Sequence, residues 1–307
     1  MKFIDGFLDT NIHYKWDNKI PAIERVSSGE LITISIPDSS TKQIKRNYGT
    51  AELKRIDDSM IDGLVGPIYV EEACPGDTLR ISIKKIIPGD WGWTAIFSKF
   101  GLLGEMFEDC LIIWDIANGY ALSATDGFLE KIRLPIKPFL GIAGTAPLIG
   151  KYPVIPPQNF GGNMDNRYLA EGSVLYLPVS VPGAMVSFAD PHALQGDGEV
   201  CGSAIETSCS VNVEIEVIKG KTLKFPVIES TEHDIGNVVV STGIASDLHF
   251  AIKESVLNMI EILMQRGFRE DEAYVLCSII GKLHISEVVD MPNFLVSMTM
   301  DTDILSY

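Results

Sequence analysis

The sequence predicts a mainly β protein with a small α+β unit at its C-terminal end. Before about residue 225, several segments alternate apolar and polar residues with the period of a strand. Turn-forming residues such as CPGD bound these segments, and apolar residues at helical spacing appear after that point. We therefore expect a β-rich body over residues 1–225, built as one or two β subdomains, and an α+β unit over residues 226–307.

The strands of the body are predicted from segments such as LITISIP (31–37) and TLRISIKKI (78–86). The apolar run over 174–189 is shorter than the roughly 20 residues that span a bilayer, and prolines and a glycine interrupt it. We interpret it as strand, turn and strand, and expect no membrane association. Over 205–217 every odd position is apolar or small and every even position is polar, which predicts one strand with a buried face and a solvated face.

The C-terminal unit is predicted from helix signals. Ser246 can cap a helix whose first turn includes Asp247, and Gly267 is placed to end it. A second helix over 269–280 stops at Gly281, and strands over 284–290 and 293–300 follow. The residues expected to form the buried stripe of the first helix are Leu248, Ile252, Val256, Met259 and Leu263.

Composition excludes several classes of function. The 307 residues include 25 Lys and Arg against 41 Asp and Glu, a formal charge of −16, and no basic run offsets it. We therefore expect no nucleic-acid partner. Neither a dinucleotide fingerprint nor a phosphate loop is present, so we expect no nucleotide cofactor. The five cysteines contain no C-x-x-C pair and MKFIDGFLDT lacks the apolar core of a signal peptide, which predicts a cytoplasmic protein without a disulfide framework.

The stretch DPHALQGDGEVCGSAIE (190–206) gathers the groups that could carry chemistry. Asp190 and His192 are two residues apart, as are Asp197 and Glu199, so in extended backbone each pair projects to one side. Aspartate and histidine suit a divalent metal such as zinc, and a further carboxylate could move protons. The alternative is an acidic turn with a hydrogen-bonded histidine, and residue types and spacing alone leave both interpretations open.

Other residues extend or compete with this interpretation. Cys201 could be a nucleophile with His192 as its base, although a small buried residue at the start of a strand is the commoner role of a cysteine. Glu206 is either a ligand or a solvated carboxylate. GGNMD (161–165) presents Asn163 and Asp165 in the same glycine-assisted way, but it is also typical of a simple loop.

The remaining acids and histidines have structural interpretations. Asp115 is a lone acid in an apolar strand and needs a partner. His13 lies between aromatic residues and is expected to pack. His233, His249 and His284 are expected to be structural, because no second coordinating group is near them in the sequence.

Several blocks of the chain resemble the acetamidase/formamidase family. The most specific is PGAMVSFADPHALQGDGEVCGSAIE (182–206). The other blocks follow in the family's order, over residues 13–34, 66–83, 89–96, 160–165 and 242–252. The segment EEACPGD departs from the family pattern at Cys74, away from the chemistry. The resemblance implies jelly-roll-like β sandwich or barrel units with a small α+β part, and hydrolysis of short amides such as formamide or acetamide to ammonia and a carboxylate.

Together these observations predict a metal-dependent amide hydrolase. Asp190 and His192 are the expected ligands of a divalent metal, zinc or alternatively calcium, with Asp165 or Glu206 as the third. Glu199 is the expected general base, with Asp197 as second choice.

An N–H group of Asn163 or of the glycine loop is expected to stabilise the oxyanion. The competing hypotheses are a Cys201-dependent amidase and a jelly-roll protein that binds a metal or small ligand without turnover. We also expect a homodimer or a higher homo-oligomer.

Overall fold

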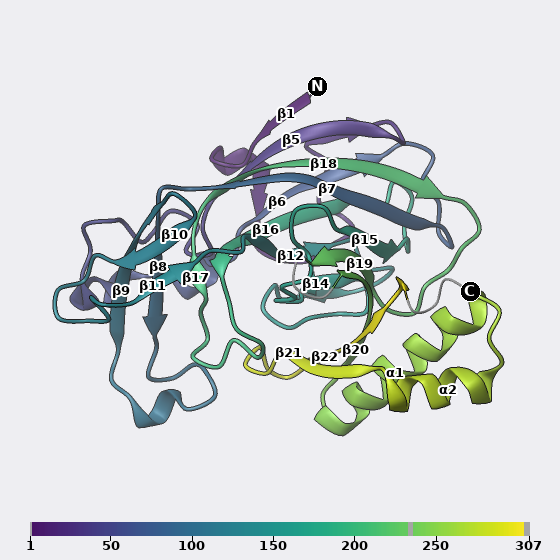
Figure 1. Ribbon diagram of the computed structural model, residues 1–307. Helices are drawn as coiled ribbons and strands as arrows, with labels where there is room; N and C mark the ends of the chain where they lie inside the picture. Colours follow the sequence, from purple (N-terminus) through teal and green to yellow (C-terminus); the bar gives the residue numbers. More distant parts are fainter. Residues whose placement is uncertain (1, 233–235, 304–307) are drawn as a thin grey trace.

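The computed structural model describes residues 2–232 and 236–303, and two large β-sheets dominate it (Figure 1). Nine strands of the described chain form the first sheet. In spatial order they are β1 (Lys2–Asp5), β5 (Glu30–Ile36), β18 (Cys209–Ile218), β7 (Thr78–Pro88), β15 (Val174–Pro178), β19 (Val227–Glu232), β20 (Gly236–Ala245), β22 (Phe294–Asp301) and β21 (Lys282–Glu287).

The second sheet contains eleven of the described strands. Its main path is β11 (Arg133–Pro135), β10 (Tyr120–Ser123), β9 (Cys110–Ala117), β8 (Trp91–Ile96), β17 (Ile205–Glu206), β16 (Val186–Leu194), β12 (Phe139–Gly144) and β14 (Gly161–Asn163). β6 (Leu64–Val70) pairs with β16 and carries β2 (Ile12–His13) and β4 (Glu24–Val26). A short pair, β3 (Trp16–Asp17) and β13 (Lys151–Tyr152), lies apart.

The core lies between the two sheets. β5 and β18 bury every second residue, as period-two alternation dictates, and the buried set includes Ile34 and Val213. These side chains pack against Val186 and Phe188 of β16 in the facing sheet. The predicted class, mainly β with a sandwich-like body, is confirmed.

The segment predicted as one strand over 205–217 is two strands in different sheets. β17 ends at Glu206 in the eleven-stranded sheet, and β18 begins at Cys209 in the nine-stranded sheet. Apolar and polar residues alternate in the same way before and after residues 207–208, so the sequence pattern does not reveal that the strand is broken there. Glu206 was expected on the solvated face of this strand, but its side chain is buried, with an exposed fraction of 2%.

Two α-helices, α1 (Leu248–Gln265) and α2 (Glu270–Ile279), pack on the end of the nine-stranded sheet (Figure 1). The cap of α1 is Asp247 and not Ser246, because the Asp247 carboxylate accepts the N–H of Phe250. Its fully buried face is centred on Ala251, Ser255, Met259 and Leu263. The three other residues predicted for the stripe, Leu248, Ile252 and Val256, are only half-buried. Four short 3₁₀ segments complete the described helices: η1 (Asp9–Asn11), η2 (Thr50–Arg55), η3 (Asp58–Met60) and η4 (Gly104–Met106).

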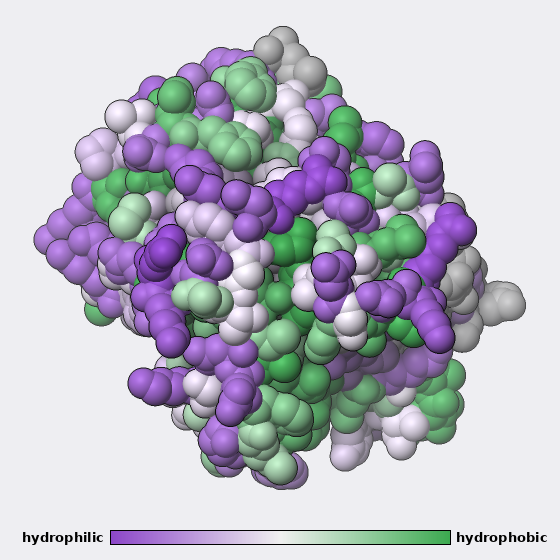
Figure 2. Space-filling model, turned by 90° about the vertical axis from the view of Figure 1, so that its left-hand side faces the viewer, coloured by the Kyte–Doolittle hydropathy of each residue, from purple (hydrophilic) through white to green (hydrophobic). Residues whose placement is uncertain are grey.

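Strands from both sides of residue 225 share the nine-stranded sheet, since β15 pairs with β19. The division into 1–225 and 226–307 stays a prediction. Viewed from the side of β8–β11, the surface shows apolar side chains gathered between polar ones on its lower half (Figure 2). Exposed apolar residues of the loop that carries η4 include Leu102, Met106 and Phe107. Among the described helices, none is long and apolar enough to cross a membrane.

Candidate active site

The site is built around β16, the central strand that carries Asp190 and His192. Every residue of this strand up to Ala193 is buried, because neighbouring strands cover both of its edges and the other sheet covers one face. The apolar run predicted as strand, turn and strand therefore places the DPH motif in the interior. The imidazole of His192 packs edge-on against Phe139 of β12, with ring centroids 4.9 Å apart.

Carboxylates surround the His192 ring. Its Nε2 atom lies 2.9 Å from Asp190 Oδ2 and 3.2 Å from Glu206 Oε2, and 3.9 Å from Glu199 Oε1. Its Nδ1 atom lies 3.9 Å from Asp165 Oδ1. The structure therefore brings together both predicted ligands and both candidates for the third, and the predicted base lies beside them.

Each carboxylate comes from a different part of the chain. Glu206 on β17 is opposite His192 in the strand pairing, and its carboxylate accepts the hydroxyl of Ser39 at 2.8 Å. Asp165 follows β14, where its backbone N–H donates to the carbonyl of Gly141. Glu199 lies in the loop after β16, which the N–H of Gly198 fastens to the carbonyl of Ser286 on β21.

Two acids of the site were missed in the sequence. Asp290, just after β21, groups with Asp165 and Glu199 closely enough to share an ion, and it accepts the side-chain amide of Asn163 at 2.7 Å. Asp62, just before β6, is buried and in electrostatic contact with Glu206. The sequence places other acids nearby, Glu287 before Asp290 and Asp58 before Asp62, but no glycine-rich loop draws attention to either pair. The sequence feature that the two acids share is their position shortly before an apolar strand.

Asp197, the second choice for the base, is not part of the cluster. Its carboxylate is exposed and accepts from Arg167 Nε at 2.9 Å, with His284 Nδ1 at 3.2 Å. Hydrogen bonding to His284 and the charge of Arg167 outweigh the effect of burial and lower the pKa of Asp197. His284 thus has an acidic partner that sequence proximity did not reveal.

The remaining predicted residues take structural positions. Cys201 is half-buried in a turn before β17, not at the start of a strand, and its thiol donates to the carbonyl of Ser203 at 3.2 Å. Asp115 pairs with Arg46 at 2.6 Å. His13 contacts Trp16 edge-on, as expected for packing. His249 is exposed on α1, and His233 lies outside the described residues.

The backbone at the site is strained. Asp62, Asp165, Asp190 and Glu199 have φ angles of 50°, 43°, 55° and 44°, in the left-handed region that non-glycine residues rarely adopt. Such a conformation costs of order 1–3 kcal/mol per residue and persists only where the surrounding structure imposes it. Four of the eleven non-glycine residues with positive φ in the described chain therefore lie in this cluster, where the surrounding structure holds their backbone in place.

Gly141 on β12 makes room for two of the acids. A Cβ atom on this residue would lie 2.3 Å from Asp190 Oδ2 and 2.6 Å from Asp165 Oδ1. Those distances are shorter than any real contact, so the two carboxylates pack against the bare backbone of the glycine. The sequence shows Gly141 only as one of several glycines in FLGIAG.

Burial and mutual repulsion decide the protonation of the cluster. Burial raises the pKa of Glu199 well above its usual range, and the charges of Asp165 and Glu206 raise it further. Burial likewise raises the pKa values of Asp190 and Asp165, against the attraction of His192. The facing carboxylates overcome the burial of His192 and raise its pKa well above the usual value.

Glu206 and Glu287 complete this pattern. Although burial opposes ionisation of Glu206, the charge of His192 and hydrogen bonds lower its pKa. Burial raises the pKa of Glu287 to about 8. Glu287 accepts the backbone N–H of Asp290, so it supports the site from the turn after β21. Within the cluster, Glu206 and Glu199 are shifted in opposite directions, which is typical of sites that hold and transfer protons.

Several ligand-type atoms in the cluster have no hydrogen-bond partner. Within the described part of the chain, these are Nδ1 of His192, both carboxylate oxygens of Asp165 and Oδ1 of Asp190, while Nε2 of His192 faces the carboxylates of Asp190 and Glu206 at 2.9 and 3.2 Å. A buried polar atom without a partner costs about 1–3 kcal/mol, and more when it is charged. One imidazole and several carboxylates are donor types that a divalent metal accepts, and three groups of them lie close enough together to share an ion.

A cavity of about 640 Å³ opens onto the cluster. Asp190, Glu199, Glu206 and Asp290 line it together with Asn163, so the acids are accessible to a small molecule. The Cys201 side chain is not part of its lining, although the neighbouring Gly202 and Ser203 are.

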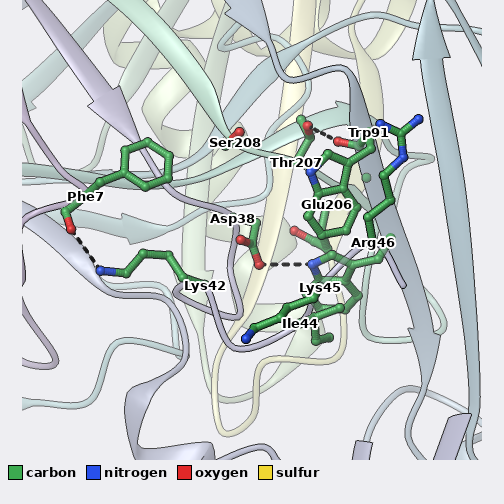
Figure 3. A pocket seen from close by; sticks show the side chains of 12 residues that line it. Phe7, Asp38, Lys42, Ile44, Lys45, Arg46, Trp91, Glu206, Thr207 and Ser208 are labelled. Atoms are coloured by element: carbon green, nitrogen blue, oxygen red, sulfur yellow. Dashed lines mark hydrogen bonds between the residues drawn. The ribbon is translucent and has the colours of Figure 1, made fainter. Parts of the chain in front are cut away.

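Figure 3 shows a second cavity, of about 270 Å³. Ile44, Trp93 and Glu206 line both cavities. The cationic groups of the second cavity have partners. Lys42 donates to the carbonyl of Phe7 at 2.9 Å and to Asp9, and Arg46 pairs with Asp90 as well as with Asp115. Glu206 lines both cavities, whereas Asp190, Glu199 and Asp290 line only the larger one.

Comparison with known proteins identifies the family. The model of the acetamidase/formamidase family matches residues 7–150 and 152–307. The chain belongs to this family. The family match and the names of the relatives make it an enzyme that hydrolyses amide carbon–nitrogen bonds, and the alternative of a binding protein without turnover is set aside.

Similar proteins of this family extend over nearly the whole chain. A formamidase of Methylophilus methylotrophus is 27% identical, covering 97% of this chain and 90% of its own length. An acetamidase of Mycolicibacterium smegmatis is 27% identical, covering 86% and 84%. A crystal structure of a predicted acetamidase/formamidase from Thermoanaerobacter tengcongensis superposes with a TM-score of 0.89 at 33% identity, covering 99% of this chain and 97% of its own.

Proposed function

We propose that this amide hydrolase uses a divalent metal, zinc in the first place, to cleave small primary amides such as formamide and acetamide. The observation that carries the proposal is the buried cluster of His192, Asp190 and Asp165, in which Nδ1 of His192, Oδ1 of Asp190 and both carboxylate oxygens of Asp165 lack hydrogen-bond partners. Buried charges of this kind are stable when they are paired or coordinate a metal. The names of the formamidase and acetamidase relatives support the substrate class.

The residues that would hold the metal are His192 and Asp190, with Asp165 or Glu206 as the third ligand. His192, Asp190 and Asp165 form one group whose ligand atoms lie within 4.8 Å of one another, and His192, Glu199 and Glu206 form another. The imidazole favours zinc over calcium, which prefers oxygen ligands. A divalent ion bound there would polarise the amide carbonyl and lower the pKa of a water molecule.

Glu199 is the proposed general base. It lines the cavity, and burial together with the charge of Asp165 raises its pKa, which makes its carboxylate a stronger proton acceptor. During hydrolysis, the water oxygen bonds to the carbonyl carbon while Glu199 accepts a water proton. The carbon–nitrogen bond then breaks, and Glu199 delivers that proton to the departing ammonia.

Asn163 is the proposed oxyanion donor. Its side-chain amide lines the cavity and is oriented by the hydrogen bond to Asp290, which occupies one of its two N–H groups. The second N–H group can donate to the carbonyl oxygen as negative charge develops there.

The competing mechanism makes Cys201 the nucleophile. Its thiol donates to Ser203 in its own turn, and the side chains around His192 are carboxylates and Phe139. These contacts favour the metal mechanism over an acyl-enzyme. Trapping with iodoacetamide or a burst of ammonia would favour the thiol.

One experiment tests the metal. The protein is purified without chelators, its metal content is measured, and ammonia release from formamide, acetamide and propionamide is assayed before and after dialysis against a strong chelator. We expect turnover to disappear with the metal and to return when zinc is added. Full activity in a verified metal-free preparation would remove the metal from the mechanism.

We also propose a cytoplasmic homodimer or higher homo-oligomer. All five cysteines are free in the structure, which is typical of a reducing compartment. Exposed apolar side chains gather near η4 and recur on α1 and α2, where Phe250, Leu257 and Ile279 are more than half exposed. Contiguous apolar surface of this kind is typical of association sites. Light scattering at several protein concentrations measures the oligomeric state.

A further inference from the structure

The larger cavity exceeds the needs of formamide or acetamide. Its volume of about 640 Å³ falls in the range of roughly 300–1,000 Å³ that holds drug-sized ligands. Acetamide displaces only a few water molecules, each of which takes about 30 Å³ in the liquid. Most of the cavity would therefore stay filled with water during turnover of such a substrate.

The wall away from the carboxylates is apolar. Trp93 of β8 is opposite Glu206 of β17 in the strand pairing, so the apolar surface begins beside a carboxylate of the site. Leu53, Ile56 and Phe97 pack in one hydrophobic cluster with Trp93. The apolar lining comprises Ile44, Leu53, Ile56, Ile61, Trp93, Phe97, Phe100 and Ile155.

The larger cavity also has an opening to solvent. The charged residues of the lining outside the buried acidic cluster are Lys54, Asp58, Lys99 and Asp109, and they are exposed and mark its solvent side. Ile56, Ile61 and Phe97 are half-buried, and they keep accessible surface in the lining of the cavity. An apolar group placed there would exclude water from that surface, which is the main source of affinity in such pockets.

We propose that the preferred substrate is a primary amide whose acyl group carries an apolar substituent of about phenyl size. This inference rests on the proposed hydrolysis at the carboxylate site. The amide reaches the acids while the substituent lies against Trp93, Ile56 and Phe97. The reaction is unchanged: water adds to the carbonyl carbon, the carbon–nitrogen bond breaks, and ammonia and an apolar carboxylic acid leave.

A substrate series tests the proposal with the metal-replete full chain. Ammonia release is measured for acetamide, butyramide, hexanamide and 2-phenylacetamide. Each buried methylene should raise kcat/KM roughly fourfold, so we expect 2-phenylacetamide to exceed acetamide by at least about tenfold. Turnover of acetamide with kcat/KM falling along the series would overturn the proposal and leave the proposed function intact. Absence of ammonia from every amide would count against the function itself.

Binding provides a readout that does not depend on turnover. In the Glu199→Gln variant, calorimetry should show 2-phenylacetamide binding at least about tenfold more tightly than acetamide. Equal affinities would overturn the proposal even if no amide were hydrolysed. N-Benzylacetamide carries the ring on the nitrogen, and faster release of benzylamine from it than of ammonia from 2-phenylacetamide would overturn the acyl-side assignment.

Substitutions in the wall locate the effect. Ile56→Trp should reduce the ratio of kcat/KM for 2-phenylacetamide to that for acetamide by about tenfold or more, because the indole fills the apolar space. Ile61→Trp provides a second variant should the first fail to fold. Ile132→Trp is the matched control, since Ile132 is exposed and is not part of the lining. An unchanged ratio in both folded wall variants would contradict the proposal.

Discussion

Glu199 and Asp197 show how two acids in one short loop come to differ. Glu199 is buried beside His192 and lines the larger cavity, whereas Asp197 is exposed and paired with Arg167. They are two residues apart, a spacing that would place both on one side of an extended chain, but Gly198 and Glu199 have φ angles of 92° and 44°, so the backbone between them is not extended. The environment of each carboxylate therefore decides its role.

Substitution of Glu199 tests this difference. Glu199→Gln keeps nearly the same shape and removes the proton carrier, so we expect kcat to fall by roughly 10²-fold or more while the metal content is retained. Asp197→Asn is the matched control and should change kcat by no more than a few-fold. Ammonia release, metal content and a melting curve are measured for each variant. Equal losses in the two variants would contradict the assignment of the base.

At the scale of elements, the active site depends on how β12 lies beside β16 and β14. Gly141 of β12 packs against the carboxylates of Asp165 and Asp190. A side chain there would have no space unless both carboxylates moved, and both are buried. The two carboxylates can therefore occupy their positions because residue 141 has no side chain.

Gly141→Ala should therefore impair the site without removing a functional group. We expect weaker metal binding and a loss of roughly tenfold or more in kcat/KM, because displacements of about 1 Å at a reacting centre can cost 10²-fold. Gly196→Ala is the matched control, since a Cβ atom on Gly196 meets nothing within 4 Å. Metal titration and ammonia release measure the two effects. A Gly141→Ala variant with normal affinity and rate would show that the carboxylates can move freely.

At the scale of the whole molecule, stability should depend on pH through His13, which joins the N-terminal segment to β16. Its Nδ1 atom lies 2.8 Å from the carbonyl of Lys15, so Nδ1 donates, and Nε2 accepts the hydroxyl of Ser187 at 2.9 Å. Burial, opposed in part by the backbone hydrogen bond, lowers the pKa of His13 to about 4. The folded protein therefore holds this imidazole neutral.

The sign of the effect follows from that pKa. In the unfolded chain His13 has a pKa of about 6.5, so its imidazole binds a proton below that pH. In the folded chain it binds this proton only near pH 4. His13 therefore makes the free energy of unfolding fall as the pH is lowered through this window, by up to about 1.4 kcal/mol per pH unit. We expect His13→Gln to have a shallower decline between pH 6.5 and 4 in urea unfolding. Parallel curves for the two proteins would contradict the lowered pKa.

Much of this protein could be predicted from local patterns. The alternation in LITISIP, the proline–glycine interruption after Val181 and the glycine that ends α1 each reflect backbone preferences within a few residues. The DPH motif placed Asp190 and His192 together for the same reason. The break between Glu206 and Cys209 was not visible, because a chain that crosses between sheets can keep its period of two.

The sequence by itself determined the fold class, the family resemblance and the segment that carries the active site. Only the tertiary structure decided which acids join His192, since Asn163 and Asp290 are 127 residues apart and meet through β14 and the turn after β21. It also decided that Asp197 faces Arg167, that Gly141 makes room for carboxylates, and that Trp93 and Ile56 form an apolar wall beside them. Period and spacing report backbone conformation over a few residues, whereas burial and charge at a site depend on which distant segments pack against it.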